Sequence, residues 1–274
     1  MKKLLVIFCV LESFFCGAQA GSFKLGVVEK IHSNLLSETR TLNIYLPEGY
    51  SDKDTATYPV IYLLDGAADE DFIHIAGLVQ FCTFPWVDKM PKSIVVGIAN
   101  TARERDMTFP TTIKAEKERF PTTGGSAKFI SFLADELQPY IRKHYRTNGQ
   151  KMIIGESLAG LLAVEVLFTR PALFDKYLVV SPSLWWDNAS LLNRPMVLTD
   201  ANRKIDVFIA VGKEGLAPSP EPHVMEVDAN VLADKLKALN NKKLSVYLDY
   251  LPDETHATIG HQAVYNGFKW LYKK

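Results

Sequence analysis

Ser157 has the sequence context of a nucleophilic serine. It follows the apolar run 152–154 and Gly155-Glu156, and a run of good helix formers, residues 158–167, begins directly after it. This order predicts a strand, a sharp turn and a helix, with the serine hydroxyl raised at the turn. The usual nucleophile-elbow pattern has glycine two residues after the serine, where this chain has Ala159. The Leu158 amide, first in the predicted helix, would face a developing oxyanion.

A serine hydroxyl needs a base to take its proton, and six histidines are candidates. Only His256 follows a predicted strand directly, precedes a helix and lies late in the chain, which is the place of the base in the order serine, acid, histidine. The acid that fixes the imidazole is expected at Glu214, at the tip of the strand between the serine and the histidine. A Ser–His dyad with a solvated Glu214 is the alternative.

A second oxyanion donor is expected in the loop after the first buried strand. Gly66 or Ala67 would supply its amide there, opposite Leu158. Asp65-Gly66 is also typical of an ordinary turn, so Gly66 has a purely structural interpretation as well.

The segment 181–187 reads Ser-Pro-Ser-Leu-Trp-Trp-Asp and follows another buried strand. Trp185 and Trp186 could form a wall against the acyl or aromatic part of a substrate, and one of the two is expected in the core. Ser181 and Ser183 have no histidine assigned to them and are interpreted as turn residues.

Residues 99–126 form a long charged segment without clear periodicity. Loops of this length in a compact domain are usually functional, and a lid is expected here. Arg103 and Arg105 within it could bind an anionic substrate. The alternative is that they pair with Glu104 or Asp106 and hold the loop in place.

The surrounding elements place these residues at one edge of a sheet. Two extended runs near the N-terminus, 24–31 and 40–46, predict an antiparallel pair. Strands and helices then alternate, which predicts a mostly parallel sheet with helices on both faces. Binding and catalytic sites of such sheets lie at the carboxyl ends of the strands. The residues that follow a predicted strand directly are Gly66, Ser157, Glu214 and His256. The remaining strands are expected at 59–64, 93–98, 177–180, 205–211 and 244–248, and the helices at 71–81, 127–145, 227–239 and 258–272.

The first 20 residues have the features of a secretory signal peptide. Lys2 and Lys3 precede an apolar run that ends in Ala-Gln-Ala, which predicts cleavage after Ala20 and a periplasmic or secreted protein with no stable membrane anchor. Without this segment, which holds two Lys and one Glu, the chain has 29 basic and 30 acidic residues. This balance gives no indication of a nucleic-acid partner.

Of the three cysteines only Cys82 lies beyond the signal segment, so no internal disulfide is expected. No Cys/His cluster has the spacing of metal ligands. Neither a metal nor an organic cofactor is expected.

The motifs together resemble the putative-esterase family of α/β-hydrolases, which includes siderophore esterases, feruloyl esterases and S-formylglutathione hydrolase. Four segments carry the resemblance, and the Ser-Pro-Ser-Leu-Trp-Trp run is most similar to the siderophore-esterase-like branch. The resemblance implies one α/β-hydrolase domain over residues 21–274, with Ser157 as nucleophile, His256 as base and Glu214 as acid. Glu156, where the family often has histidine, is a departure. The four segments are 59–66, 155–160, 181–186 and 254–256.

The sequence therefore predicts an exported serine esterase that hydrolyses a small carboxylic ester through an acyl-enzyme, with siderophore-type, aromatic or carbohydrate esters as candidate substrates. One alternative is an acyltransferase that uses the same three residues. The other is a binding protein that has the fold without the chemistry.

Overall fold

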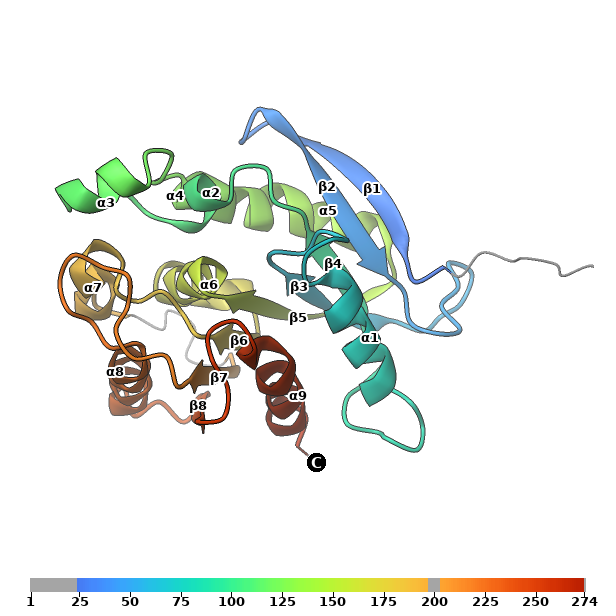
Figure 1. Cartoon of the computed structure of the whole chain (residues 1–274). Coiled ribbons are helices and arrows are strands. Elements are labelled where there is room, and N and C mark those ends of the chain that lie inside the picture. The colour runs from blue at the N-terminus through green and yellow to red at the C-terminus, as the bar shows by residue number, and fades with distance from the viewer. Residues whose placement is uncertain (1–23, 197–202, 274) are drawn as a thin grey trace, which may run out of the picture.

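The computed structural model describes residues 24–196 and 203–273, and Figure 1 traces them from the N-terminal strands to the C-terminal helix. The expected signal peptide, residues 1–20, lies outside the described residues.

An eight-stranded sheet forms the centre of the fold, in the order β1-β2-β4-β3-β5-β6-β7-β8. β2 pairs antiparallel with both β1 and β4, and every other neighbouring pair is parallel. The prediction of a mostly parallel sheet with an N-terminal antiparallel pair is confirmed, and the architecture is that of an α/β-hydrolase. The strands are β1 (Val27–Ser33), β2 (Glu38–Tyr45), β3 (Tyr58–Leu63), β4 (Ile94–Ile98), β5 (Thr147–Glu156), β6 (Lys176–Val180), β7 (Ile205–Gly212) and β8 (Leu244–Leu251).

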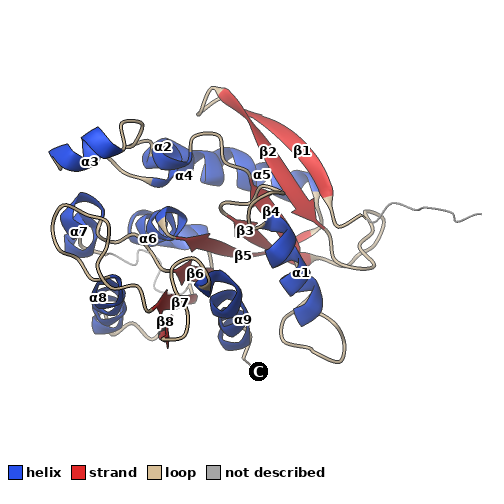
Figure 2. Cartoon of the chain, in the orientation of Figure 1, coloured by secondary structure: helices blue, strands red, loops and turns tan. Residues whose placement is uncertain are grey.

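Helices cover both faces of this sheet (Figure 2), which explains why the central strands are continuous apolar runs. One apolar cluster joins the sheet to α1 and α9, and a second, larger cluster joins the other face to α4, α5, α6 and α8. The main helices are α1 (Phe72–Cys82), α4 (Ser126–Ser131), α5 (Gln138–His144), α6 (Leu158–Thr169), α7 (Trp186–Asn193), α8 (Met225–Ala238) and α9 (Ile259–Leu271).

Two segments differ from the expectation. The helix predicted over 127–145 is divided by a π-helical stretch, Phe132–Leu137, that lies between α4 and α5. Segment 99–126 contains two short helices, α2 (Arg103–Met107) and α3 (Lys114–Arg119). Helices of five and six residues are too short to show a hydrophobic period, so the sequence pattern could not reveal them.

None of the helices in the described ranges is both long enough and apolar enough to cross a bilayer.

Candidate active site

Ser157 occupies a strained turn between β5 and α6. Its φ of 60° and ψ of −120° lie outside the regions favoured by residues with a side chain, a strain that functional sites often hold. A Cβ on Gly155 would lie 2.4 Å from the Ala159 carbonyl oxygen, so only glycine permits the close approach of strand and helix here. The Ser157 amide donates to the Val180 carbonyl at 3.0 Å and ties the turn to β6. Ala159 itself is fully buried and fits this turn.

Glu214 and His256 meet at the ends of β7 and β8. His256 Nδ1 lies 2.5 Å from Glu214 Oε2, and because a carboxylate only accepts, we assign the proton to Nδ1. Nε2 is then the free base. The loops that carry the two residues are joined by the Lys213 amide, which donates to the Glu254 carbonyl at 2.8 Å.

The two groups shift each other's pKa in opposite directions. The hydrogen bond to Glu214 raises the pKa of His256 above its ordinary value, although partial burial opposes this. Burial opposes ionisation of Glu214, whose side chain is only 4% exposed, but hydrogen bonds from His256 and Ser181 outweigh it and hold the Glu214 pKa below its ordinary value. Both shifts favour the ion pair that forms when His256 takes a proton.

The turn after β6 connects the nucleophile to the acid. The Ser181 hydroxyl donates to Glu214 Oε1, which the Gly212 amide also approaches at 3.2 Å. Two residues later, Ser183 Oγ lies 3.3 Å from Ser157 Oγ, and the Ser183 amide donates to the Ser157 carbonyl at 3.0 Å. Sequence analysis interpreted both serines as turn residues and missed these contacts. Their position could have indicated these contacts, because both serines follow β6, and β6 lies between β5, which leads to the nucleophile, and β7, which leads to the acid.

No hydrogen bond joins Ser157 to His256 among the described residues; the hydroxyl instead approaches Ser183. Catalytic hydrogen bonds are commonly long in unliganded enzymes and tighten when substrate binds. A rotation about the Ser157 Cα–Cβ bond would turn Oγ away from Ser183.

The predicted oxyanion donors differ in availability. The Gly66 amide donates to the Ile98 carbonyl at 3.0 Å, so it is committed to the sheet and is not available to an oxyanion. The Ala67 amide donates to Glu70 Oε2 at 3.0 Å, an exposed carboxylate that can rotate away. Leu158 is the first residue of α6, and the amides of a helix's first turn have no acceptor within the helix. Ala67 and Leu158 therefore remain the two candidates.

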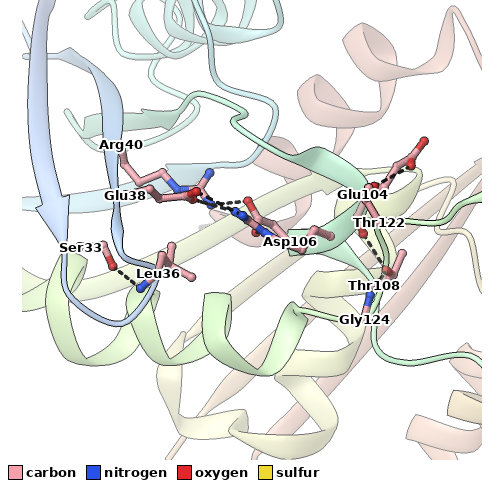
Figure 3. A network of polar contacts seen from close by, with 10 residues as sticks. Ser33, Leu36, Glu38, Arg40, Glu104, Asp106, Thr108, Thr122 and Gly124 are labelled. Atoms are coloured by element: carbon pink, nitrogen blue, oxygen red, sulfur yellow. Dashed lines mark hydrogen bonds and ion pairs between the residues drawn. The ribbon is translucent and has the colours of Figure 1, made fainter.

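Arg105 forms ion pairs within the protein and does not line the cavity beside Ser157, where contact with substrate was predicted. It pairs with Asp106 at 2.8 Å and with Glu38 at 2.7 Å, and the buried Arg40 binds the same two carboxylates. Figure 3 shows this cluster between β2 and α2. The alternative interpretation, in which Arg105 pairs with Asp106 and holds the segment, describes the observed geometry.

The same segment is held by contacts within itself and by contacts with α7. The Gly124 amide donates to Thr108 Oγ1 at 3.0 Å, close to the Thr122–Glu104 contact in Figure 3. Beyond it, the Thr112 amide donates to Asp187 Oδ1 at 2.6 Å.

Arg103, in contrast, lies beside the nucleophile. Its guanidinium binds Asp65 through two hydrogen bonds, at 2.7 and 2.8 Å, and approaches the Glu156 carbonyl at 3.5 Å. Its charge is therefore already matched by a carboxylate.

Trp185 and Trp186 are 4% and 0% exposed, and neither lines the cavity at Ser157. The Trp186 indole N–H donates to the Phe109 carbonyl at 2.8 Å. The prediction that one tryptophan is core therefore understates their burial: both are core residues, and both rings pack against Phe120 of segment 99–126.

A cavity of about 380 Å³ opens beside Ser157, between α1 and the start of α9. Acidic side chains dominate its polar lining. No group of three or more His, Cys, Asp or Glu residues in the described ranges is arranged to hold a metal ion. The lining residues are Asp65, Glu70, Asp71, His74, Arg103, Glu156, Ser157, Ala257, Thr258, Gly260 and His261.

Comparison with known proteins identifies the family of this chain. The family model described as "Putative esterase" matches residues 33–256. The chain belongs to the putative esterase family. It is 30% identical over 215 residues to the ferri-bacillibactin esterase BesA of Bacillus subtilis, covering 74% of this chain and 71% of the relative.

Solved structures support the assignment of this esterase. An IroE-like serine hydrolase from Shewanella oneidensis superposes with a TM-score of 0.78 at 34% identity, over 90% of this chain and 80% of the other. The BES protein from Bacillus cereus gives a TM-score of 0.79 at 27% identity, over 96% and 100% of the two chains. The protein is thus a carboxylic ester hydrolase with an α/β-hydrolase fold.

Proposed function

We propose that this esterase is an exported serine hydrolase in which Ser157, His256 and Glu214 form the catalytic triad. The observation that carries the proposal is the 2.5 Å contact between His256 Nδ1 and Glu214 Oε2, at the same sheet edge as a serine held at φ 60°. This combination of a strained serine and an oriented imidazole is the arrangement needed for acyl transfer.

The reaction follows from the geometry. Ser157 Oγ attacks the ester carbonyl while His256 Nε2 takes the hydroxyl proton, and the Glu214 carboxylate stabilises the imidazolium. The Leu158 and Ala67 amides hold the oxyanion once Glu70 has rotated aside. His256 returns its proton to the departing alcohol. Water then attacks the acyl-enzyme while His256 takes a proton from the water, and His256 gives that proton to Ser157 Oγ as the acid product leaves.

For the substrate we propose a small ester of the siderophore type. The support is the 30% identical relative whose name states ferri-bacillibactin as its substrate. We further propose that residues 1–20 direct export, that residues 21–274 form the single mature domain, and that segment 99–126 acts as a lid. The family match over residues 33–256 supports the single domain, and the place of Arg103 in the cavity lining supports the lid.

Hydrolysis of short-chain p-nitrophenyl esters by the wild-type protein and by Ser157→Ala tests the triad. We expect a loss of at least about 10³-fold in kcat in the variant, and labelling of the wild type alone by a fluorophosphonate probe. Equal rates, or equal labelling, in the two proteins would remove Ser157 from the mechanism. The matched control is Ser183→Ala, which removes a neighbouring hydroxyl and leaves the strained turn intact.

A further inference from the structure

The cavity beside Ser157 carries an excess of negative charge. Four carboxylates line it, from Asp65, Glu70, Asp71 and Glu156, whereas its only arginine or lysine within the described ranges is Arg103. A substrate that enters meets this field before it reaches the nucleophile.

Arg103 does not offset the excess, because Asp65 binds it through two hydrogen bonds. None of the ion pairs within residues 24–196 and 203–273 includes Glu70, Asp71 or Glu156. An anionic substrate, which Arg103 suggested from sequence, would therefore approach three carboxylates that form no ion pair with any described residue.

Glu156 is placed to contact the substrate because it directly precedes Ser157. Its carboxylate lies against α9, where a Cβ on Gly260 would be 2.7 Å from Oε2. The absence of a side chain at Gly260 leaves room for that carboxylate at the cavity wall. Asp71 lines the same cavity and lies close enough for its negative charge to raise the pKa of Glu156, so a cation in the cavity would lie near both carboxylates.

We propose that Glu156 and Asp71 determine specificity, so that the cavity accepts an ester with an ammonium group near the scissile bond and disfavours an ester with a carboxylate there. This inference rests on the proposed function of Ser157 and concerns the charge of the group beside the scissile bond, independently of the siderophore-type substrate proposed above. An ammonium between the two carboxylates would gain attraction and hydrogen bonds from both.

The preference should grow as the pH rises through neutrality. Burial raises the pKa of Glu156 to about 7, and repulsion from Asp71 contributes further, so this carboxylate gains its charge in the neutral range. The charged and titratable groups around it come from several elements: Asp65, Glu70 and Asp71 before α1, His74 on α1, Arg103 on α2, Glu214 after β7, His256 before α9 and His261 on α9.

Matched esters measure this preference directly. The p-nitrophenyl esters of aminohexanoate, heptanoate and pimelate differ only in ending with an ammonium, a methyl or a carboxylate. A second set places the same three end groups on the alcohol of a hexanoate ester, which covers the other side of the scissile bond. We expect kcat/KM for the cationic ester to exceed that of the neutral one by about tenfold in one of the two sets, with the anionic ester slowest.

The variants Glu156→Gln and Asp71→Asn should each reduce the cationic-to-neutral ratio several-fold, and added KCl should reduce it in the wild type. Asp234→Asn, an exposed carboxylate on α8, changes the net charge equally and should leave the ratio unchanged. The ratio also cancels the ionisation of His256, which affects both esters alike. Its rise across neutral pH should therefore be lost in Glu156→Gln.

The outcomes separate the two claims. Similar kcat/KM values for all three end groups in both sets, with hydrolysis that depends on Ser157, would overturn this inference and leave the proposed function standing. A ratio unchanged in both Glu156→Gln and Asp71→Asn would overturn it as well. Absence of Ser157-dependent hydrolysis for every ester would refute the proposed function and the inference with it.

Discussion

Replacing Glu214 by glutamine tests the role assigned to this buried acid. The substitution keeps the size of the side chain and removes the charge that lies 2.5 Å from His256 Nδ1. The wild-type carboxylate raises the pKa of His256, so its loss should lower that pKa. Because only the neutral imidazole can accept the serine proton, the acid limb of the kcat/KM profile should move to lower pH, while the plateau falls.

The size of the fall follows from the charge pair. Opposite unit charges about 4 Å apart attract with about 4 kcal/mol at an effective dielectric constant of 20 and with about 1 kcal/mol in water. His256 is 46% exposed and Glu214 only 4%, so a value between these limits, about 3 kcal/mol, is expected. This value corresponds to a loss of about 100-fold in plateau kcat/KM.

The assay is hydrolysis of one p-nitrophenyl ester from acid to alkaline pH, with Glu221→Gln as the control. Glu221 is exposed in the loop that follows Glu214, so the same chemical change there should alter neither the plateau nor the acid limb. A Glu214→Gln plateau that is close to wild type would show that a Ser–His dyad suffices. An acid limb displaced to higher pH would refute the electrostatic reasoning itself.

Three further changes probe the groups that hold the site and its lid segment. Ser181→Ala should lower kcat/KM about fivefold in the ester assay, because Glu214 loses one hydrogen bond and keeps two. Gly155→Ala should lower the free energy of unfolding by about 2–3 kcal/mol in thermal denaturation, since the new Cβ would lie 2.4 Å from the Ala159 carbonyl oxygen. Arg40→Met should destabilise the protein by about 2–3 kcal/mol in urea, because Glu38 and Asp106 lose one of their two cations and keep only the more exposed Arg105.

Each of these changes has a matched control. Ser219→Ala removes a hydroxyl that bonds only within its own loop, Gly77→Ala adds a Cβ that meets nothing within 4 Å, and Arg170→Met breaks an exposed ion pair of 3.7 Å. The controls should change activity or stability by less than about 1 kcal/mol. A control as damaging as its partner would mean that the contact named above is not the cause.

The order of elements and the residues at strand ends could be predicted from sequence. Buried parallel strands are continuous apolar runs, and the residue after such a run lies at the carboxyl edge of the sheet. This rule, together with the Gly-x-Ser turn and the chain order, selected Ser157, Glu214 and His256, and the structure has them after β5, β7 and β8. Chain order and the strand-end rule require no knowledge of side-chain contacts.

The partners of individual polar side chains could not be predicted in this way. Arg103 and Arg105 are two residues apart with similar surroundings in sequence, yet one lines the cavity and the other joins a cluster on β2. The bond from Ser181 to Glu214 spans 33 positions. Such pairings depend on how strands far apart in the chain are ordered in the sheet, and no local period encodes that order.

Through the turn Ser181-Pro182-Ser183, the spacing of the strands sets how the catalytic residues are aligned. One serine contacts the nucleophile on β5 and the other contacts the acid after β7, so the spacing of three adjacent strands fixes the distance between them. Segment 99–126 is attached elsewhere, to β2 and to the turn at Asp187. Substitutions in α3 and its flanking loops could therefore accumulate without moving the catalytic residues, whereas Glu156 and Asp71, which we propose to select the ester, line the same cavity as the nucleophile and are less free to change.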